Sequence, residues 1–185
     1  MAPPSLPPWP VSPPRHGRVL LRDVRRSDVD MARALAADPY VPQTGSLPAD
    51  ASAEEALAWV HRQRRRHAEG TGFSFTVVDA GTGTAVGHCG LWLRDLPRGT
   101  AGYSIAPLAR GQGLATDALR ALTDFGWTVP GLDRIELDIE PWNVASLRTA
   151  ERAGYVRDGS STRTIGGELR DVVRYVAVRP PSRGR

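Results

Sequence analysis

The chain has 185 residues and a formal net charge of +4, and all 24 of its Lys and Arg positions are Arg. The absence of Lys excludes Schiff-base catalysis and the P-loop signature, because both need a lysine amine. The single cysteine, Cys89, excludes intrachain disulfides and multi-cysteine metal sites, and no H-x-x-x-H pair occurs, so we expect no metal. No stretch reaches the ~18 apolar residues of a membrane helix, and no signal peptide is visible at the start. We therefore expect a cytoplasmic protein with no membrane partner.

The excess positive charge lies near the two ends of the chain. Residues 1–17 contain seven prolines, which predicts a disordered tail, and residues 179–185 carry three Arg and no acid, which predicts a second, basic tail. Residues 18–178 then form one domain that is close to neutral, so we do not expect a nucleic-acid partner. The Arg cluster in residues 62–66 fits a solvated helix end, with a phosphate or RNA patch as the alternative.

Strand and helix signals alternate along the first half of the domain. Ser52 and Glu55 form an S-x-x-E capping box, followed by Ala53, Ala56, Leu57 and Val60 on one helix face. Ser27 and Asp30 resemble a similar box. The predicted elements are strands at 19–22, 73–78, 84–93 and 100–105, and helices at 29–37 and 52–70.

The second half continues with a long amphipathic helix and an alternating strand. In residues 134–139, Ile135, Leu137 and Ile139 alternate with charged residues, which predicts one buried and one outward face. Three consecutive strands before the long helix favour a mixed sheet, in an α/β (α+β) fold, over an all-parallel one. The predicted elements are helices at 112–127 and 143–153 and strands at 134–139, 172–178 and near 155–156 or 163–165.

A glycine-rich turn joins the strand that ends at Ile105 to the long helix. It contains Gly111 and Gly113, and a helix start of this kind presents unpaired N–H groups and a positive dipole end to an anion. The alternative is a tight turn in which the glycines serve geometry only. A dinucleotide-binding fold fits poorly, since Thr116 replaces its third glycine and Asp133 precedes the next strand.

Two motifs give this turn a family context. Arg110 to Ala115 reads R-x-x-G-x-G/A, and Asn143-x-x-Ser146 is followed after eight positions by Gly154-Tyr155. Both motifs, in this order and spacing, resemble the Gcn-type N-acetyltransferase (GNAT) superfamily and its ribosomal-protein N-alpha-acetyltransferase (Rim-type) branch. The resemblance covers nearly all of residues 18–178.

The resemblance implies an acyl-CoA N-acyltransferase fold with a mixed, mostly antiparallel central sheet flanked by helices. Its central strands, ending at Ile105 and Ile139, would splay apart to admit the pantetheine arm of acetyl-CoA. It further implies that Ser146 is catalytic and that acetyl-CoA is the acyl donor. The residues implied to bind acetyl-CoA are Ile105, Arg110, Gly111, Gln112, Gly113, Leu114, Ala115, Thr116 and Asn143.

The acid and base are less sharply indicated. Many superfamily members place a Tyr where this chain has Ala150, which leaves the Ser146 hydroxyl to assist the leaving thiolate, unless Ser146 only completes the helix start. Glu140, Asp138 and His88 are the candidates for the base, each with a structural role as the alternative.

By the same resemblance, the acceptor slot lies between the loop 38–50 and the final hairpin around Gly166-Gly167-Glu168. Tyr40, Glu168 and Asp171 would meet a cationic acceptor there.

The sequence thus predicts an N-acetyltransferase that moves an acetyl group from acetyl-CoA to a primary amine by direct attack in a ternary complex. The acceptor is a protein N-terminus or a small-molecule amine, and a homodimer stays open. The alternatives are a non-catalytic acyl-CoA sensing module and a ribosome- or RNA-associating protein. Cys89, between His88 and Gly90 in a strand, is expected to be a small buried residue rather than a nucleophile.

Overall fold

The computed structural model describes residues 6–181. These residues form an eight-stranded sheet in the order β1-β2-β3-β4-β5-β6-β8-β7. All neighbouring pairs are antiparallel except β5 and β6, so the prediction of a mixed, mostly antiparallel sheet is confirmed. The elements are β1 (Arg15–His16), β2 (Val19–Asp23), α1 (Val29–Ala36), α2 (Ala53–Arg65), β3 (Gly72–Asp79), β4 (Thr84–Asp95), β5 (Arg98–Ile105), α3 (Leu114–Gly126), β6 (Arg134–Ile139), α4 (Val144–Arg152), β7 (Val156–Ile165) and β8 (Glu168–Val178).

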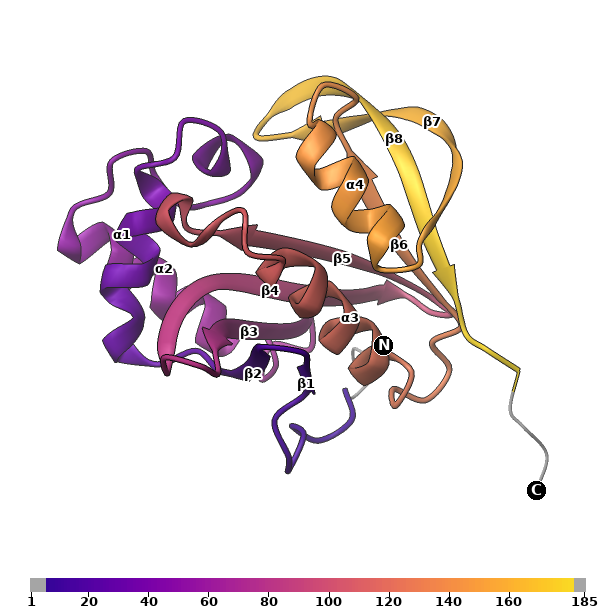
Figure 1. Ribbon diagram of the computed structural model, residues 1–185, viewed down its shortest axis with the longest axis horizontal. Coiled ribbons are helices and arrows are strands. Elements are labelled where there is room, and N and C mark those ends of the chain that lie inside the picture. The colour runs from indigo at the N-terminus through magenta and orange to yellow at the C-terminus, as the bar shows by residue number, and fades with distance from the viewer. Residues whose placement is uncertain (1–5, 182–185) are drawn as a thin grey trace.

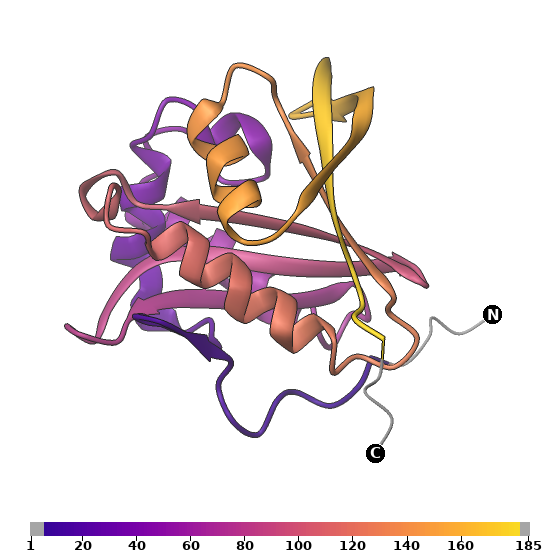
Figure 2. The same cartoon turned by 45° about the vertical axis from the view of Figure 1, so that its right-hand side comes forward.

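Helices cover both faces of the sheet (Figures 1 and 2). On one face, α3 buries Ala118, Leu119, Leu122 and Phe125 in the larger core cluster, so the predicted amphipathic helix has its apolar stripe on the sheet. Burial of a Leu or Phe side chain of this kind contributes about 1.5–3 kcal/mol. On the other face, α1 and α2 form a second hydrophobic cluster, to which α2 contributes Ala56, Trp59 and Val60. Two residues predicted for that buried face differ from the prediction: Leu57 is only partly buried, and Ala53 is exposed.

Side-chain caps set the starts of α2 and of the short 3-10 turn Arg26–Asp28 that leads into α1. Glu55 N–H donates to Ser52 Oγ at 3.2 Å and Ser52 N–H donates to the Glu55 carboxylate at 2.8 Å, which confirms the predicted box. The box predicted from Ser27 and Asp30 is wrong. The Asp28 carboxylate, which accepts a backbone N–H three residues earlier at 2.8 Å, takes its place.

Pairing between β5 and β6 stops after three residue pairs. Arg98, Gly99 and Thr100 face residues 134–136 in a parallel register, and no further pair follows. Beyond Thr100, β5 stays paired with β4 as far as Ile105, while β6 stays paired with β8. The two strands therefore splay apart toward Ile105 and Ile139, as the family resemblance implied.

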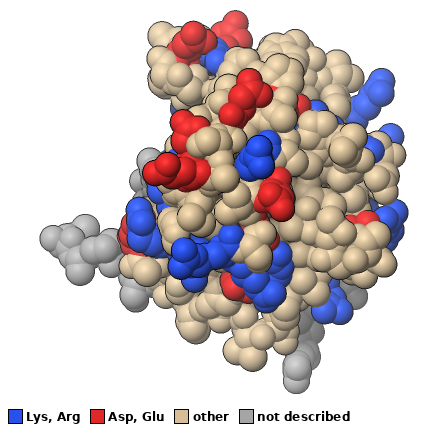
Figure 3. Space-filling model, turned by 90° about the vertical axis from the view of Figure 1, so that its left-hand side faces the viewer, with Lys and Arg blue, Asp and Glu red and all other residues tan. Residues whose placement is uncertain are grey.

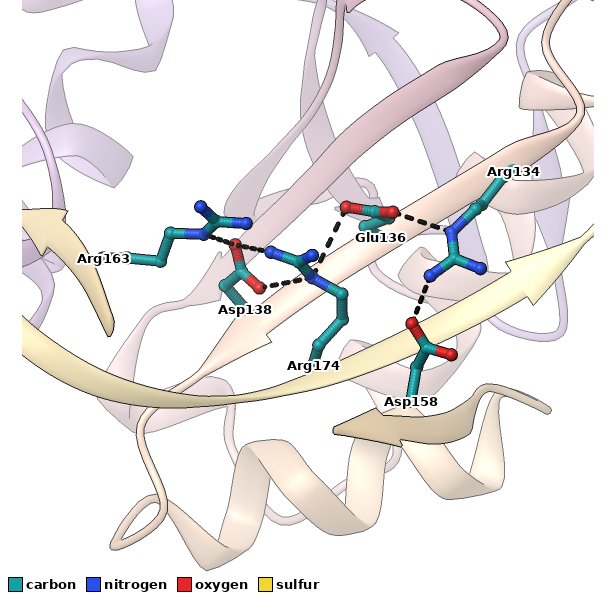
Figure 4. Close-up of polar contacts among 6 residues, drawn as sticks. All are labelled: Arg134, Glu136, Asp138, Asp158, Arg163 and Arg174. Atoms are coloured by element: carbon teal, nitrogen blue, oxygen red, sulfur yellow. Dashed lines mark hydrogen bonds and ion pairs between the residues drawn. The ribbon is translucent and has the colours of Figure 1, made fainter. Parts of the chain in front are cut away.

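Strand β6 has partners on both of its faces, which corrects the prediction of a solvent-facing charged side. Glu136 is only 9% exposed. Arg174 of β8 lies 3.4 Å from Glu136 and 3.0 Å from Asp138, because the long β7–β8 hairpin carries cations alongside β6. Figure 4 shows the network, which consists of Arg134, Glu136, Asp138, Asp158, Arg163 and Arg174.

The proline-rich segment is not a disordered tail over the part that the structure describes. Trp9 packs on Phe75, with ring centroids 4.8 Å apart, and also contacts Phe73. The Pro7 carbonyl is bonded to His67 Nε2 at 2.9 Å. Prolines prevent helix and central strand here, yet a bulky aromatic among them anchors the segment. Residues 1–5 lie outside the described residues.

The predicted C-terminal tail also begins with an anchored residue. Arg179 donates to the carbonyl oxygens of Trp127, Val129 and Leu132 at 2.5–2.8 Å. Its guanidinium lies 3.3 Å from the Asp133 carboxylate. Arg179 therefore belongs to the folded domain, and residues 182–185 of the predicted tail are outside the described residues.

Candidate active site

The glycine-rich turn opens α3 toward open space. Gly111 (φ 77°) and Gly113 (φ 80°) both have left-handed backbone, and a Cβ on either would meet no atom within 4 Å. Gly113 caps α3, and Leu114, the first residue of the helix, is 2% exposed. The glycines are therefore required by the backbone, and they also leave the helix N-terminus open to an anion.

The other predicted residues of the turn differ in exposure. Gln112 is exposed and Ala115 is partly buried. Thr116 is buried, so its hydroxyl is less accessible than the glycines. The turn thus offers the N–H groups at the start of α3 together with the exposed side chain of Gln112.

Arg110 connects the end of β5 to the loop 38–50. Its Nε donates to the Ile105 carbonyl at 2.9 Å, and its NH1 lies 2.7 Å from the Asp38 carboxylate. Asp38 also accepts the backbone N–H groups of Tyr40 and Val41 at 2.8 Å each. Burial alone would raise the pKa of Asp38, but these donors and Arg110 outweigh burial and lower it, so Asp38 stays ionised.

The start of α4 carries the candidate hydroxyl. Asn143 Oδ1 accepts the Ser146 N–H at 3.1 Å, which makes Asn143 the N-cap of α4. Ser146 Oγ lies 2.8 Å from the hydroxyl of Tyr103 on β5. Ala150 is fully buried, with no polar atom in its side chain.

Sequence reasoning missed Tyr103. The available signal was its place in a strand expected to splay, two residues from both Ala101 and Ile105. Those two residues belong to the core cluster on the α3 face, and Tyr103 packs against the same cluster.

A buried carboxylate directly follows β6. Glu140 is 7% exposed, its Oε2 lies 3.3 Å from Arg170, and it is hydrogen bonded to Tyr40 and Trp142. Although burial raises the pKa of Glu140, these partners lower it below its usual range, so the carboxylate is ionised at neutral pH. The Tyr40 hydroxyl also contacts Asn143. Burial, together with the neighbouring Glu140, raises the pKa of Tyr40.

The loop 38–50 and the final hairpin are in contact, and the acceptor slot that the family resemblance implied between them stays a prediction. A Cβ on Gly166 would lie 2.1 Å from the Gln43 carbonyl oxygen. Arg170 donates to Gln43 Oε1 at 3.3 Å and to Glu168 at 3.1 Å. Asp171 instead accepts the hydroxyl of Thr162 on β7 at 3.3 Å. The structure thus joins Tyr40 and Glu168 through Glu140 and Arg170, and gives Asp171 a different partner.

Residues 18–156 match the sequence model of the family described as "Acetyltransferase (GNAT) domain". The chain belongs to the GNAT family. The family resemblance is thereby confirmed, and the chain is an acyl-CoA-dependent N-acetyltransferase of this family.

Individual relatives place this GNAT chain among N-acetyltransferases. It is 26% identical over 144 residues to "Uncharacterized N-acetyltransferase p20" of Bacillus licheniformis, covering 77% of this chain and 81% of that protein. It resembles the structure of Mycobacterium smegmatis RimJ in complex with CoA-disulfide, with TM-score 0.75, 23% identity and coverage of 96% and 88%. It also resembles the ribosomal-protein-S5-alanine acetyltransferase from Vibrio fischeri, with TM-score 0.71, 18% identity and coverage of 91% and 97%.

Two of the three base candidates of the GNAT domain have structural roles. His88 is bonded to the Ser74 hydroxyl at 2.7 Å and packs against Trp59, and burial lowers its pKa to about 3. Asp138 is paired with Arg174 and Arg163. Both side chains are thus held within the fold, as Glu140 is by Arg170, and the general base stays a prediction.

Two further sequence predictions concern Cys89 and the Arg cluster. Cys89 is fully buried and burial raises its pKa, which confirms a small buried residue. In the cluster, Arg62 donates to the Ser46 carbonyl and Arg65 pairs with Glu69. Figure 3 shows acidic and basic side chains on the same face of the GNAT domain, which is therefore not uniformly positive.

Within residues 6–181, no helix is long and apolar enough to cross a membrane.

Proposed function

We propose that this GNAT enzyme transfers an acetyl group from acetyl-CoA to a primary amine by direct attack within a ternary complex. The observation that carries the proposal is the opening between β5 and β6, where pairing stops after Thr100. Unpaired strand edges offer backbone hydrogen bonds to an extended ligand, which suits a pantetheine arm. The glycine turn at one end of β5 and Ser146 at the start of α4 supply the remaining functions.

On the donor side, the backbone of the turn holds the pyrophosphate and the edge of β5 holds the pantetheine arm. The N-terminus of α3 provides both N–H donors and dipole without any lysine. Ser146 donates a hydrogen bond to the sulfur as negative charge develops on it. The proposed donor site comprises Ile105, Arg110, Gly111, Gln112, Gly113, Leu114, Ala115, Thr116 and Asn143.

On the acceptor side, Glu140 receives the amine. Its lowered pKa makes it an anchor for the ammonium rather than a strong base, so the proton leaves to water before attack. The amine nitrogen then bonds to the thioester carbon and gives its second proton to water. The C–S bond breaks, and its electron pair leaves with the CoA sulfur. Tyr40 holds Glu140 in place from the loop 38–50.

Among primary amines, a protein N-terminus is the acceptor that we favour over a small molecule. The hydroxyl nearest the start of α4 is Ser146, and position 150 is Ala, a pattern that resembles the Rim-type branch. The likeness of the fold to two Rim-type acetyltransferases supports this choice. A polyamine or an aminoglycoside is the second acceptor class.

Two measurements test the proposed function. Calorimetry with CoA comes first, and absence of binding at low micromolar concentration would overturn the proposal. Thiol release from acetyl-CoA is then followed with a peptide that has a free α-amine, with spermidine and with kanamycin, using the N-acetylated peptide as the matched control. Release with the free peptide alone supports N-terminal acetylation. CoA binding without release on any amine supports a sensing module instead, and RNA binding without CoA binding supports the third alternative.

A further inference from the structure

Tyr103 connects the two sides of the opening. It lies on β5 beyond the last pair with β6, and its hydroxyl reaches across to α4. That hydroxyl lies 2.8 Å from Ser146 Oγ and 3.3 Å from the Ser146 carbonyl oxygen, and it also contacts the Thr149 side chain. The phenol therefore meets the candidate catalytic hydroxyl at the point where the strands separate.

Ser146 is held from two directions. Its backbone N–H donates to Asn143 Oδ1, and its side chain faces Tyr103. A serine hydroxyl has one hydrogen and two lone pairs, so a donor on one lone pair leaves the hydrogen to point elsewhere. Thr149, one turn further along α4, already donates its hydroxyl to the Ala145 carbonyl at 2.9 Å. Ser146 is thus the hydroxyl that Tyr103 can orient.

We propose that Tyr103 is a positioning residue for acetyl transfer, whose hydroxyl donates to Ser146 Oγ and directs the serine hydrogen at the sulfur of CoA. This inference rests on the proposed function. As the C–S bond breaks and the electron pair moves to sulfur, Ser146 donates a hydrogen bond to the thiolate, which later takes a proton from water. No proton leaves Tyr103 in this step. Burial raises the pKa of Tyr103, which keeps its phenol protonated and able to donate at neutral pH.

The thiol of bound CoA gives a test that needs no acceptor amine. Its ionisation is followed by ultraviolet difference absorbance in the wild type, Tyr103→Phe, Ser146→Ala and the double variant. Loss of a hydrogen bond to the thiolate should raise the thiol pKa by about one unit in each variant. The double variant should match Ser146→Ala, because Tyr103 acts through Ser146. A wild-type thiol pKa in either single variant overturns the inference.

Tyr175→Phe is the matched control. The Tyr175 hydroxyl also donates from a strand to α4, to Glu151 at 2.7 Å, but at the other end of the helix. It should leave the thiol pKa unchanged, and a shift equal to that of Tyr103→Phe would show a general effect of loosening α4. Single-turnover transfer in Tyr103→Phe should fall about tenfold with CoA affinity within twofold.

The two proposals fail in different ways. A wild type that does not bind CoA overturns the proposed function. A wild type that binds CoA, together with a Tyr103→Phe variant of unchanged thiol pKa and transfer rate, overturns only the role of Tyr103. If Tyr103→Phe does not fold, the test uses Ser146→Ala. A wild-type thiol pKa in Ser146→Ala would show that Ser146 does not act on the sulfur, and Tyr103 would then have no group to act through.

Discussion

The Arg110 guanidinium lies 2.7 Å from the Asp38 carboxylate and joins the glycine-rich turn to the loop 38–50. Asp38 also holds the N–H groups of Tyr40 and Val41, and Tyr40 in turn contacts Glu140. One carboxylate thus connects the proposed phosphate site to the proposed acceptor site.

Asp38→Ala should loosen this loop. It removes the cap on two backbone N–H groups, and we expect the free energy of unfolding to fall by about 1–2 kcal/mol, measured by urea denaturation. The KM for the amine should rise about tenfold because Tyr40 is no longer held beside Glu140. Asp38→Asn keeps a side-chain oxygen that accepts a backbone N–H and loses only the charge. Its loss of stability should therefore be smaller than that of Asp38→Ala. An unchanged amine KM in the folded Ala variant would contradict the coupling.

Gly113→Ala should weaken CoA binding at least tenfold by calorimetry. The added Cβ stands in the open approach to the N-terminus of α3, and left-handed backbone in a non-glycine residue costs about 1–2 kcal/mol. Gly83→Ala is the matched control, since Gly83 (φ 72°) has the same backbone conformation and equally open surroundings in the β3–β4 turn. Both variants should lose similar stability, and equal CoA affinities in the two would exclude this turn as the phosphate site.

Glu140→Gln should lower kcat/KM for the amine about tenfold and leave CoA affinity unchanged, because the ammonium loses its anchor. It also changes the acid response. The folded pKa of Glu140 is lowered, so its charge stabilises the fold above the unfolded pKa of about 4.3, and that stability is lost as pH falls through the folded pKa. The stability difference between wild type and Glu140→Gln should therefore shrink below about pH 4 in urea titrations. A difference that stays constant into acid would show that Glu140 is not ionised in the fold.

His88 should make the wild type less stable in mild acid. Its pKa is lowered to about 3 by burial, while an unfolded His titrates near 6.5, so the unfolded state binds more protons in between. Stability should fall by about 1.4 kcal/mol per pH unit from about pH 6.5 toward 3. His88→Gln should remove this contribution to the slope, as measured by denaturation at a series of pH values. The same slope in both proteins would mean that His88 gains its proton within the fold.

Short-range patterns carried much of the prediction. The apolar stripe of α3, the Ser52 box and the Asn143 cap depend on residues within one or two helical turns, and all are present. The glycine turn is likewise local, because its two left-handed positions, Gly111 and Gly113, are only two residues apart in the chain. The splayed strands came from the family resemblance and not from any such pattern.

Long-range contacts account for what the sequence did not reveal. Tyr103 and Ser146 are 43 positions apart, and Arg170 and Glu140 are 30 apart. The charged residues of β6 were expected to face solvent because alternation within a strand says nothing about cations on a neighbouring strand. The packing of Trp9 could not be predicted for the same reason. A run of prolines does not show which surface an aromatic side chain will cover.

The complete burial of Cys89 has a practical use. It is the single cysteine of the chain, and it lies in β4 directly opposite Tyr103 of β5. A thiol reagent added to the native enzyme therefore reacts with released CoA and leaves the protein untouched. When the reagent does modify the protein, the central sheet has come apart beside the opening. The rate of labelling at Cys89 therefore measures how often the sheet opens there.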